Sequence, residues 1–221
     1  MTMSVIQRGG SRPALPESPY STLGKSPMCL DRPRHQAASH VQLSRAWVPG
    51  GTYFFTVNLL ERDCRLRVEN IEALRTAFLQ ARMERPFEIL AIVILPDHLH
   101  CLWRLPPDDT NNATRWRHIK SVFSRALPPG EPRSPRRMAK GERGIWRRRY
   151  WEHLIRDERD LVAHVDYIHI NPVKHGHAIK VADWPYSSFH RHVRRGDLPL
   201  DWAGLSDDIT GFGERAKPDI S

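Results

Sequence analysis

The sequence of 221 residues predicts an α+β sandwich, in which helices pack on a small antiparallel sheet. Apolar segments of strand length alternate with amphipathic segments of helical length, in the order strand, helix, hairpin, helix, strand, helix. Hydrophobic residues make up 40% of the chain, which is enough for a core and excludes wholesale disorder. No apolar run approaches the roughly 18 residues that a membrane span needs, so no membrane partner is expected.

The first strand and helix are expected between residues 52 and 85. Residues 52–59 (TYFFTVNL) are rich in β-branched and aromatic residues, which favour a strand. Asn70 is a suitable N-cap for the helix that follows, and Pro86 ends it. Apolar residues recur on one face of this segment, which indicates a helix packed on the sheet.

A hairpin is expected next. Residues 87–95 (FEILAIVIL) form a nearly continuous apolar run, which indicates a strand buried on both faces. Pro96 and Asp97 then make a turn, and residues 98–105 (HLHCLWRL) return as the second strand.

The second half of the chain repeats the pattern with a longer connection. Residues 113–127 fit an amphipathic helix, and residues 128–144 form a Pro-, Gly- and Arg-rich loop of unusual length. Residues 145–155 have strand-like aromatics, residues 158–171 are expected to be helical, and 183–195 are expected to form a further helix.

Positive charge is concentrated in one segment. Lys and Arg outnumber Asp and Glu by 34 to 25, which favours a polyanionic partner, most often nucleic acid. Residues 104–150 hold 13 of the basic and 4 of the acidic residues, so the whole excess of nine lies there. The candidate phosphate-binding residues of this segment are Arg115, Arg117, Lys120, Arg133, Arg136, Arg137, Arg147, Arg148 and Arg149. Arg115, Arg117 and Lys120 are expected on or beside the outer surface of their helix.

Two histidines on the second hairpin strand form a candidate metal-binding pair. His98 and His100 are two residues apart, so both side chains emerge on one face of a strand. Leu99 and Cys101 point to the other face, which argues against a His/Cys zinc site. The three cysteines of the chain are far apart with no CxxC pair, which fits a reducing cytoplasm.

A tyrosine lies on the last long helix among polar groups. Tyr167, Asn171 and Lys174 fall within an arc of about 60°, away from an apolar stripe on the same helix. Pro172 disfavours helical geometry at Asn171, so the helix is expected to kink or end there. A tyrosine needs a neighbouring metal or base to act as a nucleophile, and a divalent ion held by His98 and His100 would polarise a phosphodiester. Asn171 could supply a third, oxygen ligand, and Lys174 is a further candidate DNA contact.

Three more histidines flank this tyrosine. His164, His169 and His175 could assist proton transfer, but we interpret each as a surface residue.

Together these motifs resemble the REP-associated tyrosine transposases, relatives of the single-tyrosine HUH insertion-sequence transposases. LPDHLHCLW followed by HVDYIHINPVKHG carries the resemblance, and GGTYFFTVNL, RYWEHLIRD and DWPYSSFHR match the family's further motifs in order. The resemblance spans about residues 48 to 204. It implies a ferredoxin-like HUH-endonuclease sandwich that cleaves and rejoins single-stranded or hairpin DNA of the REP type through a 5′-phosphotyrosine intermediate.

Residue by residue, the resemblance places the metal ligands on His98, His100 and Asn171 and the nucleophile on Tyr167. The implied cofactor is a divalent metal, Mg²⁺ or Mn²⁺; oxygen ligands favour Mg²⁺, whereas imidazoles suit Mn²⁺ better. Two features depart from the family pattern, namely the long N-terminal extension and the expanded loop 128–144.

The resemblance also suggests how the chain divides. Residues 1–43 are expected to be a disordered N-terminal extension, and 44–180 a catalytic domain of the HUH single-tyrosine type that includes the basic loop. Residues 181–221 are expected to form a C-terminal helix and tail. We expect a cytoplasmic, nucleoid-associated protein that is a monomer or a homodimer.

Two other functions remain compatible with the residues. A DNA-binding regulator that keeps the fold but does not cut would bind hairpin DNA without cleaving it. A metal-dependent nuclease without a covalent intermediate would stay active after Tyr167→Phe and lose activity after His98→Ala.

Overall fold

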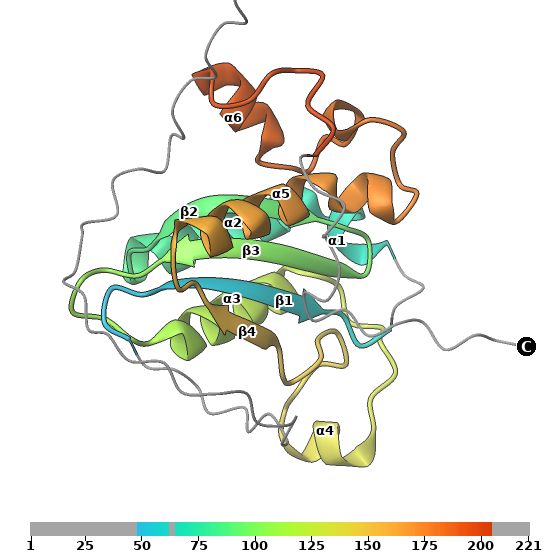
Figure 1. The fold of residues 1–221 in the computed structure, drawn as a ribbon. Helices are drawn as coiled ribbons and strands as arrows, with labels where there is room; N and C mark the ends of the chain where they lie inside the picture. Colours follow the sequence, from blue (N-terminus) through green and yellow to red (C-terminus); the bar gives the residue numbers. More distant parts are fainter. Residues whose placement is uncertain (1–47, 62–64, 205–221) are drawn as a thin grey trace, which may run out of the picture. The chain divides into compact units, whose positions relative to one another are not determined.

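A computed structural model describes residues 48–61 and 65–204, and the statements below concern these ranges. Four antiparallel strands form one sheet in the order β2-β3-β1-β4 (Figure 1). The strands are β1 (Thr52–Asn58), β2 (Glu88–Ile94), β3 (His98–Arg104) and β4 (Trp151–Leu154). A βαββαβ chain with this strand order is the ferredoxin-like arrangement, so the predicted α+β sandwich is confirmed.

Helices cover both faces of the sheet. The helices α2 (Ile71–Glu84) and α3 (Asn112–Ala126) pack on one face, and α5 (Glu158–Lys174) crosses the other (Figure 1). The large core lies under α2 and α3, where the rings of Phe55, Trp103 and Trp116 contact one another. Because apolar burial is the main driving force of folding, this face supplies most of the stability.

The hairpin strand β3 contributes to both faces. Leu99, Cys101 and Trp103 enter the core under α2 and α3, as strand alternation predicts. His98 and His100 therefore project from the opposite face, which α5 covers.

The helix α5 is longer than expected. Asp157 caps it, because its side chain accepts a hydrogen bond from the Asp160 backbone nitrogen. The helix continues through Pro172 to Lys174, whereas the sequence predicts an end or a kink at Asn171. A proline in the last turn removes only one backbone donor, and Pro172 is buried against the rest of the molecule, so tertiary packing offsets the loss.

The connection between α3 and β4 is only partly the loop that the sequence predicts. This connection contains a short helix, α4 (Pro135–Ala139). Elsewhere in the chain, another short helix, α1 (Leu66–Glu69), precedes α2. The strand expected over residues 145–155 is shorter, because only Trp151–Leu154 pairs with β1. Earlier in this stretch, Trp146 forms a single bridge with Leu59.

The segment after α5 closes one edge of the sheet. The sequence predicts a helix over residues 183–195, but the structure has a 3₁₀ turn, Val181–Asp183, and then α6 (Phe189–Arg195). Between them, Ser188 donates a backbone hydrogen bond to Ile92 and accepts one at its side-chain oxygen, so the chain pairs with the outer edge of β2. Such cover protects an edge strand from pairing with other chains. Within the described residues, no helix is long and apolar enough to cross a membrane.

Candidate active site

Two buried histidines lie side by side under α5. His98 and His100 are both buried, and their ring centroids are 4.8 Å apart. In the sheet register, His98 lies opposite Asn58 and His100 opposite Thr56. The predicted placement of the pair on one face of a strand is therefore confirmed by the fold.

Each histidine is oriented by a polar neighbour through the same ring nitrogen. The Nδ1 atom of His98 lies 2.7 Å from the Asp97 carboxylate, and Nδ1 of His100 lies 2.9 Å from the hydroxyl of Thr56. Metal-ligating histidines commonly make such a bond with the nitrogen that does not bind the metal. The Nε2 atoms would then be the ones to bind a metal, and this donor set would fit a divalent ion.

The nucleophile candidate is next to this pair. The ring of Tyr167 lies 5.1 Å from that of His100 and 5.9 Å from that of Phe54. Tyr167 is fully buried, and the ammonium of Lys174 lies 4.7 Å over its ring. The sequence predicts that Tyr167 lies on a polar face of the helix, away from the apolar stripe. In the structure both faces are buried, because the face that carries Tyr167 packs on the sheet.

Asn171 lies midway in the sequence between Tyr167 and His175, and each of these residues contacts one member of the histidine pair. Tyr167, four residues before it, contacts His100, and the ring of His175, four residues after it, lies 5.2 Å from that of His98. Residues four apart share a helix face, so Asn171 faces the pair from the middle of this stretch. Its buried amide oxygen is a suitable third ligand for a divalent ion.

Burial changes the chemistry of several groups on α5. His164 and His169 are buried, so the expectation of surface histidines is wrong for both, whereas His175 is exposed as predicted. Burial lowers the pKa of His164, and it lowers that of His169 to about 3, so both are neutral near pH 7. Burial raises the pKa of the Asp166 carboxyl to about 6.

One of the predicted phosphate contacts lies in the interior. Arg115 is 1% exposed, and its guanidinium donates to three backbone carbonyls and to the Asp109 carboxylate. It therefore ties α3 to neighbouring turns instead of facing solvent. The expectation that Arg115 lies on the outer surface is wrong, because the helix is rotated so that this position faces the end of α2.

Most of the other basic candidates are at the surface. Those that are exposed are Arg117, Arg133, Arg136, Arg147, Arg148 and Arg149. Arg136 and Arg147 have no ion-pair partner among the described residues, whereas Arg148 bonds to Glu142 at 2.8 Å. Arg137 is half-buried and donates to the carbonyls of Arg143 and Trp146.

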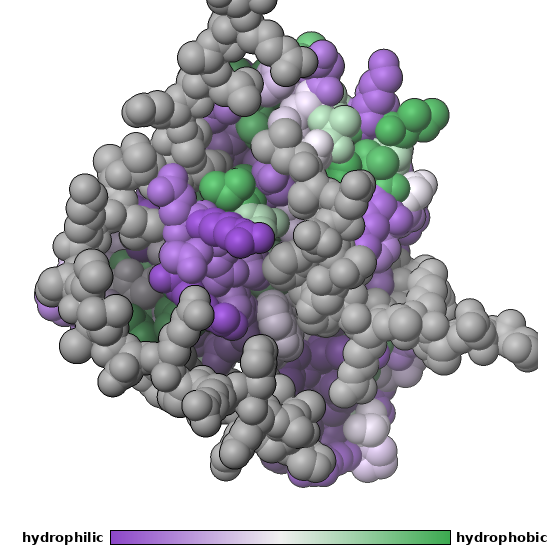
Figure 2. All heavy atoms as spheres, viewed as in Figure 1, coloured by the Kyte–Doolittle hydropathy of each residue, from purple (hydrophilic) through white to green (hydrophobic). Residues whose placement is uncertain are grey.

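A basic pocket of about 370 Å³ lies between α4 and the approach to β4. It is lined by Leu60, Ser134, Arg136, Arg137, Arg147 and Arg148. The described surface around α4 is largely hydrophilic (Figure 2). The backbone nitrogen of Arg147 bonds to the carbonyl of Asn58, which lies opposite His98. Arg147 is thus about two strand spacings, about 10 Å, from the histidine strand.

Lys120, on α3, contacts the backbone of this pocket. Its ammonium donates to the Arg147 carbonyl at 2.9 Å and lies over the rings of Trp146 and Tyr150. Burial, with a smaller contribution from the nearby Arg67, lowers the pKa of Lys120 to about 8. The hydrogen bond from Lys120 to the Arg147 carbonyl holds the backbone of the pocket in place.

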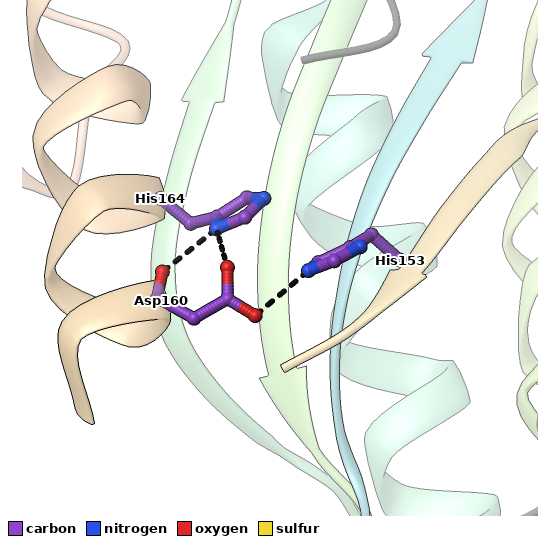
Figure 3. Close-up of side chains that lie close together, drawn as sticks. All are labelled: His153, Asp160 and His164. Atoms are coloured by element: carbon purple, nitrogen blue, oxygen red, sulfur yellow. Dashed lines mark hydrogen bonds and ion pairs between the residues drawn. The ribbon is translucent and has the colours of Figure 1, made fainter. Parts of the chain in front are cut away.

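A second group of ligand-type side chains, His153, Asp160 and His164, lies on the same face of the sheet (Figure 3). Their ligand atoms all lie within 4.8 Å of one another, so the group could hold a metal ion. Sequence reasoning did not find this group. The signal was present in part, because Asp160 and His164 have the i, i+4 spacing of one helix face.

Comparison with known proteins identifies the family, although no family model matches the chain. A curated relative from Escherichia coli (strain K12), described as a REP-associated tyrosine transposase, is 47% identical over 173 residues. This match covers 77% of the chain and 95% of the relative. The chain belongs to the REP-associated tyrosine transposase family. A Haemophilus influenzae relative with the same family name is 48% identical over 165 residues, covering 74% of the chain and 93% of the relative.

A solved structure supports the same assignment for the fold. It is described as the REP-associated tyrosine transposase bound to a REP hairpin, and it matches with a TM-score of 0.68 and 45% identity. The match covers 80% of the chain and 99% of the solved chain. The resemblance to REP-associated tyrosine transposases is therefore confirmed, together with the fold that it implies.

Proposed function

We propose that the chain is a metal-dependent DNA endonuclease and strand transferase that acts on REP-type hairpin or single-stranded DNA. The observation that carries the proposal is the contact between Tyr167 and His100, 5.1 Å between ring centroids, beside a second oriented histidine. Membership of a tyrosine transposase family and the hairpin-bound relative support the choice of substrate.

His98, His100 and Asn171 would hold the ion, which we propose to be Mg²⁺ or Mn²⁺. When bound, it would neutralise charge on a non-bridging phosphate oxygen of the DNA. Asp97 and Thr56 orient the two imidazoles through Nδ1, which fixes the ring positions before the ion and the DNA arrive.

Tyr167 would attack the scissile phosphorus through its phenolic oxygen. The bond from tyrosine oxygen to phosphorus forms, the bond from phosphorus to the 3′-oxygen breaks, and the leaving oxygen takes up a proton as a free 3′-hydroxyl. A 5′-phosphotyrosine ester remains, and attack by a 3′-hydroxyl reverses the step and rejoins the strand. The ammonium of Lys174, which lies 4.7 Å over the Tyr167 ring, would attract the phosphate that Tyr167 attacks.

The exposed arginines around α4 would hold the DNA backbone. The backbone of Arg147, which lines the pocket together with Arg136, lies about 10 Å from the histidine strand, so single-stranded DNA bound there would be close enough to enter the site. The other exposed candidates would add positive charge, Arg133, Arg148 and Arg149 in the same connection between α3 and β4 and Arg117 on α3. Such contacts contribute affinity with little sequence information.

The test is formation of a covalent adduct with a labelled hairpin DNA that carries single-stranded flanks, in Mg²⁺ or Mn²⁺. We expect the wild-type protein to give an adduct that survives denaturing electrophoresis and Tyr167→Phe to give none. Tyr186→Phe is the matched control, because Tyr186 packs against the core and lies outside the site.

The two alternative functions give different results in the same assay. Cleavage that persists in Tyr167→Phe, but not in His98→Ala, would indicate a nuclease without a covalent intermediate. Hairpin binding by the wild-type protein without cleavage in either metal would indicate a regulator. An adduct of equal amount from Tyr167→Phe would overturn the assignment of the nucleophile.

A further inference from the structure

We infer that His153, Asp160 and His164 form a second metal site, specific for zinc-class divalent ions and separate from the His98–His100 pair. The three side chains converge from two elements: His153 from β4, and Asp160 and His164 from successive turns at the start of α5 (Figure 3). The ring of Phe54 separates them from the candidate active site, because it contacts His164 on one side and His100 and Tyr167 on the other.

The distances fit the size of a bound ion. Nε2 of His153 lies 2.8 Å from one oxygen of Asp160, and Nδ1 of His164 lies 3.0 Å from the other. Ligand atoms around a tetrahedral zinc ion are about 3.3 Å apart, since each zinc–ligand bond is about 2.0–2.1 Å. The two contacts of Asp160 would lengthen by a few tenths of an ångström to admit the ion. The most widely separated ligand atoms, which lie within 4.8 Å of each other, would approach by up to about 1.5 Å.

The donor set selects the ion. Two imidazoles and one carboxylate form the three-ligand set of many zinc sites with one open coordination position, and the imidazoles are poor ligands for Mg²⁺. The side chains of His153 and Asp160 are 19% and 18% exposed, so an ion can enter from solvent.

Hydrogen bonds hold the three ligands together without an ion. Asp160 also accepts a bond from the Arg156 backbone nitrogen, and Nδ1 of His164 lies 2.7 Å from the Asp160 carbonyl. These bonds preorganise the cluster, and metal binding would exchange the contacts from His153 and His164 for metal–ligand bonds. The bound ion would fasten the edge strand β4 to the helix that carries Tyr167, one turn beyond His164.

The test counts zinc equivalents by titration calorimetry on the full chain without DNA. His153→Phe keeps a ring stacked between Trp151 and His164 but removes the ligand, so its fold is expected to persist. We expect His153→Phe to bind one equivalent of Zn²⁺ fewer than the wild-type protein. Co²⁺ in the wild-type protein should give the absorption of a tetrahedral site, and this band should be absent from His153→Phe.

Two further variants make the result specific. His118→Phe is the matched control, because His118 also pairs with a carboxylate, Glu84, but on the opposite face of the sheet. It should bind as many equivalents as the wild-type protein. Asp160→Asn should lower the zinc affinity of the cluster at least 30-fold and gives a second measure of the site.

The inference is independent of the proposed DNA chemistry. If the His98–His100 pair does not bind an ion, the wild-type protein still binds one zinc more than His153→Phe. Equal stoichiometry and equal affinities in the wild-type protein and His153→Phe would overturn the inference, and the cluster would then be a hydrogen-bonded link between β4 and α5.

Discussion

The two faces of the sheet differ in what the same strands contribute to them. On the face under α2 and α3, Phe55, Trp103 and Trp116 form an aromatic core. On the face under α5, the strands present His98 and His100 beside Tyr167. Because side chains alternate between the two faces of a strand, a residue that stabilises the core and a residue proposed to take part in the chemistry are neighbours in the sequence.

This separation allows a buried polar site on a stable domain. Burying a polar group without a hydrogen bond is costly, and the histidine face meets this cost with local partners such as Asp97 and Thr56. The core face supplies the compensating apolar burial on the other side of the same strands. Substitutions on the two faces should therefore change different quantities.

The largest effect is expected from His100→Asn. The asparagine keeps a polar group within reach of Thr56 and removes the Nε2 atom that we propose binds the metal, so we expect the rate of adduct formation to fall about 10³-fold or more. The free energy of unfolding should fall by only about 1–2 kcal/mol, since the ring contacts of His100 with Phe54, His98 and Tyr167 are lost but its place is kept by a polar side chain. Single-turnover adduct assays and urea unfolding measure the two quantities. An adduct rate near that of the wild-type protein would remove His100 from the site.

Trp103→Ala should show the reverse pattern. Trp103 is fully buried among the rings of the core, and truncation of such a side chain costs about 3–5 kcal/mol of unfolding free energy. The adduct rate per folded molecule should stay within a few-fold of the wild-type rate, and Trp103→Phe should show a smaller version of the same effect. A large loss of rate in folded Trp103→Phe would show that the two faces are coupled.

Asp166→Asn tests a buried carboxyl group of α5 through its pH dependence. Burial raises the pKa of Asp166 to about 6, so between about pH 4 and pH 6 the folded protein keeps a proton that the unfolded chain releases. The stabilising contribution is thus present at low pH and is lost as the pH rises through 6. We expect Asp166→Asn to raise the free energy of unfolding by about 1–2 kcal/mol at pH 7 and by little at pH 4. Thermal unfolding at both pH values checks the sign, and a pH-independent difference would contradict it.

The sequence predicts those features that depend on local periodicity. The alternation at His98 and His100, the hairpin turn before them and the order of elements are all properties of neighbouring residues. The four-residue spacing of Tyr167 and Asn171 is likewise local, and it places both on the face of α5 that meets the sheet.

Features that depend on which surfaces meet in three dimensions are not predictable in this way. Arg115 is buried because α3 turns this position toward the end of α2, and nothing in its local sequence distinguishes it from the exposed Arg117. His164 is buried because the edge strand β4 brings His153 against it. Helix periodicity also treats Pro172 as a break, whereas packing of the last turn keeps α5 helical to Lys174.

The smallest expected effect distinguishes surface arginines by what surrounds them. Arg147 is exposed, has no ion-pair partner among the described residues and lines the basic pocket, so Arg147→Ala should weaken hairpin binding about 3- to 10-fold. The magnitude of the slope of the logarithm of affinity against the logarithm of salt concentration should also decrease by about 0.7–0.9. Each phosphate contact releases counterions on binding, and the variant makes one contact fewer.

Arg75→Ala provides the matched control for this measurement. Arg75 is also exposed, but it lies on α2, on the other side of the sheet, and pairs with Glu72. Its removal should leave both the affinity and the salt slope unchanged. Equal losses from the two variants would mean that binding responds to total charge and not to the pocket, whereas a loss confined to Arg147→Ala would place the DNA backbone at the pocket, beside the end of β1 that pairs with the strand carrying His98.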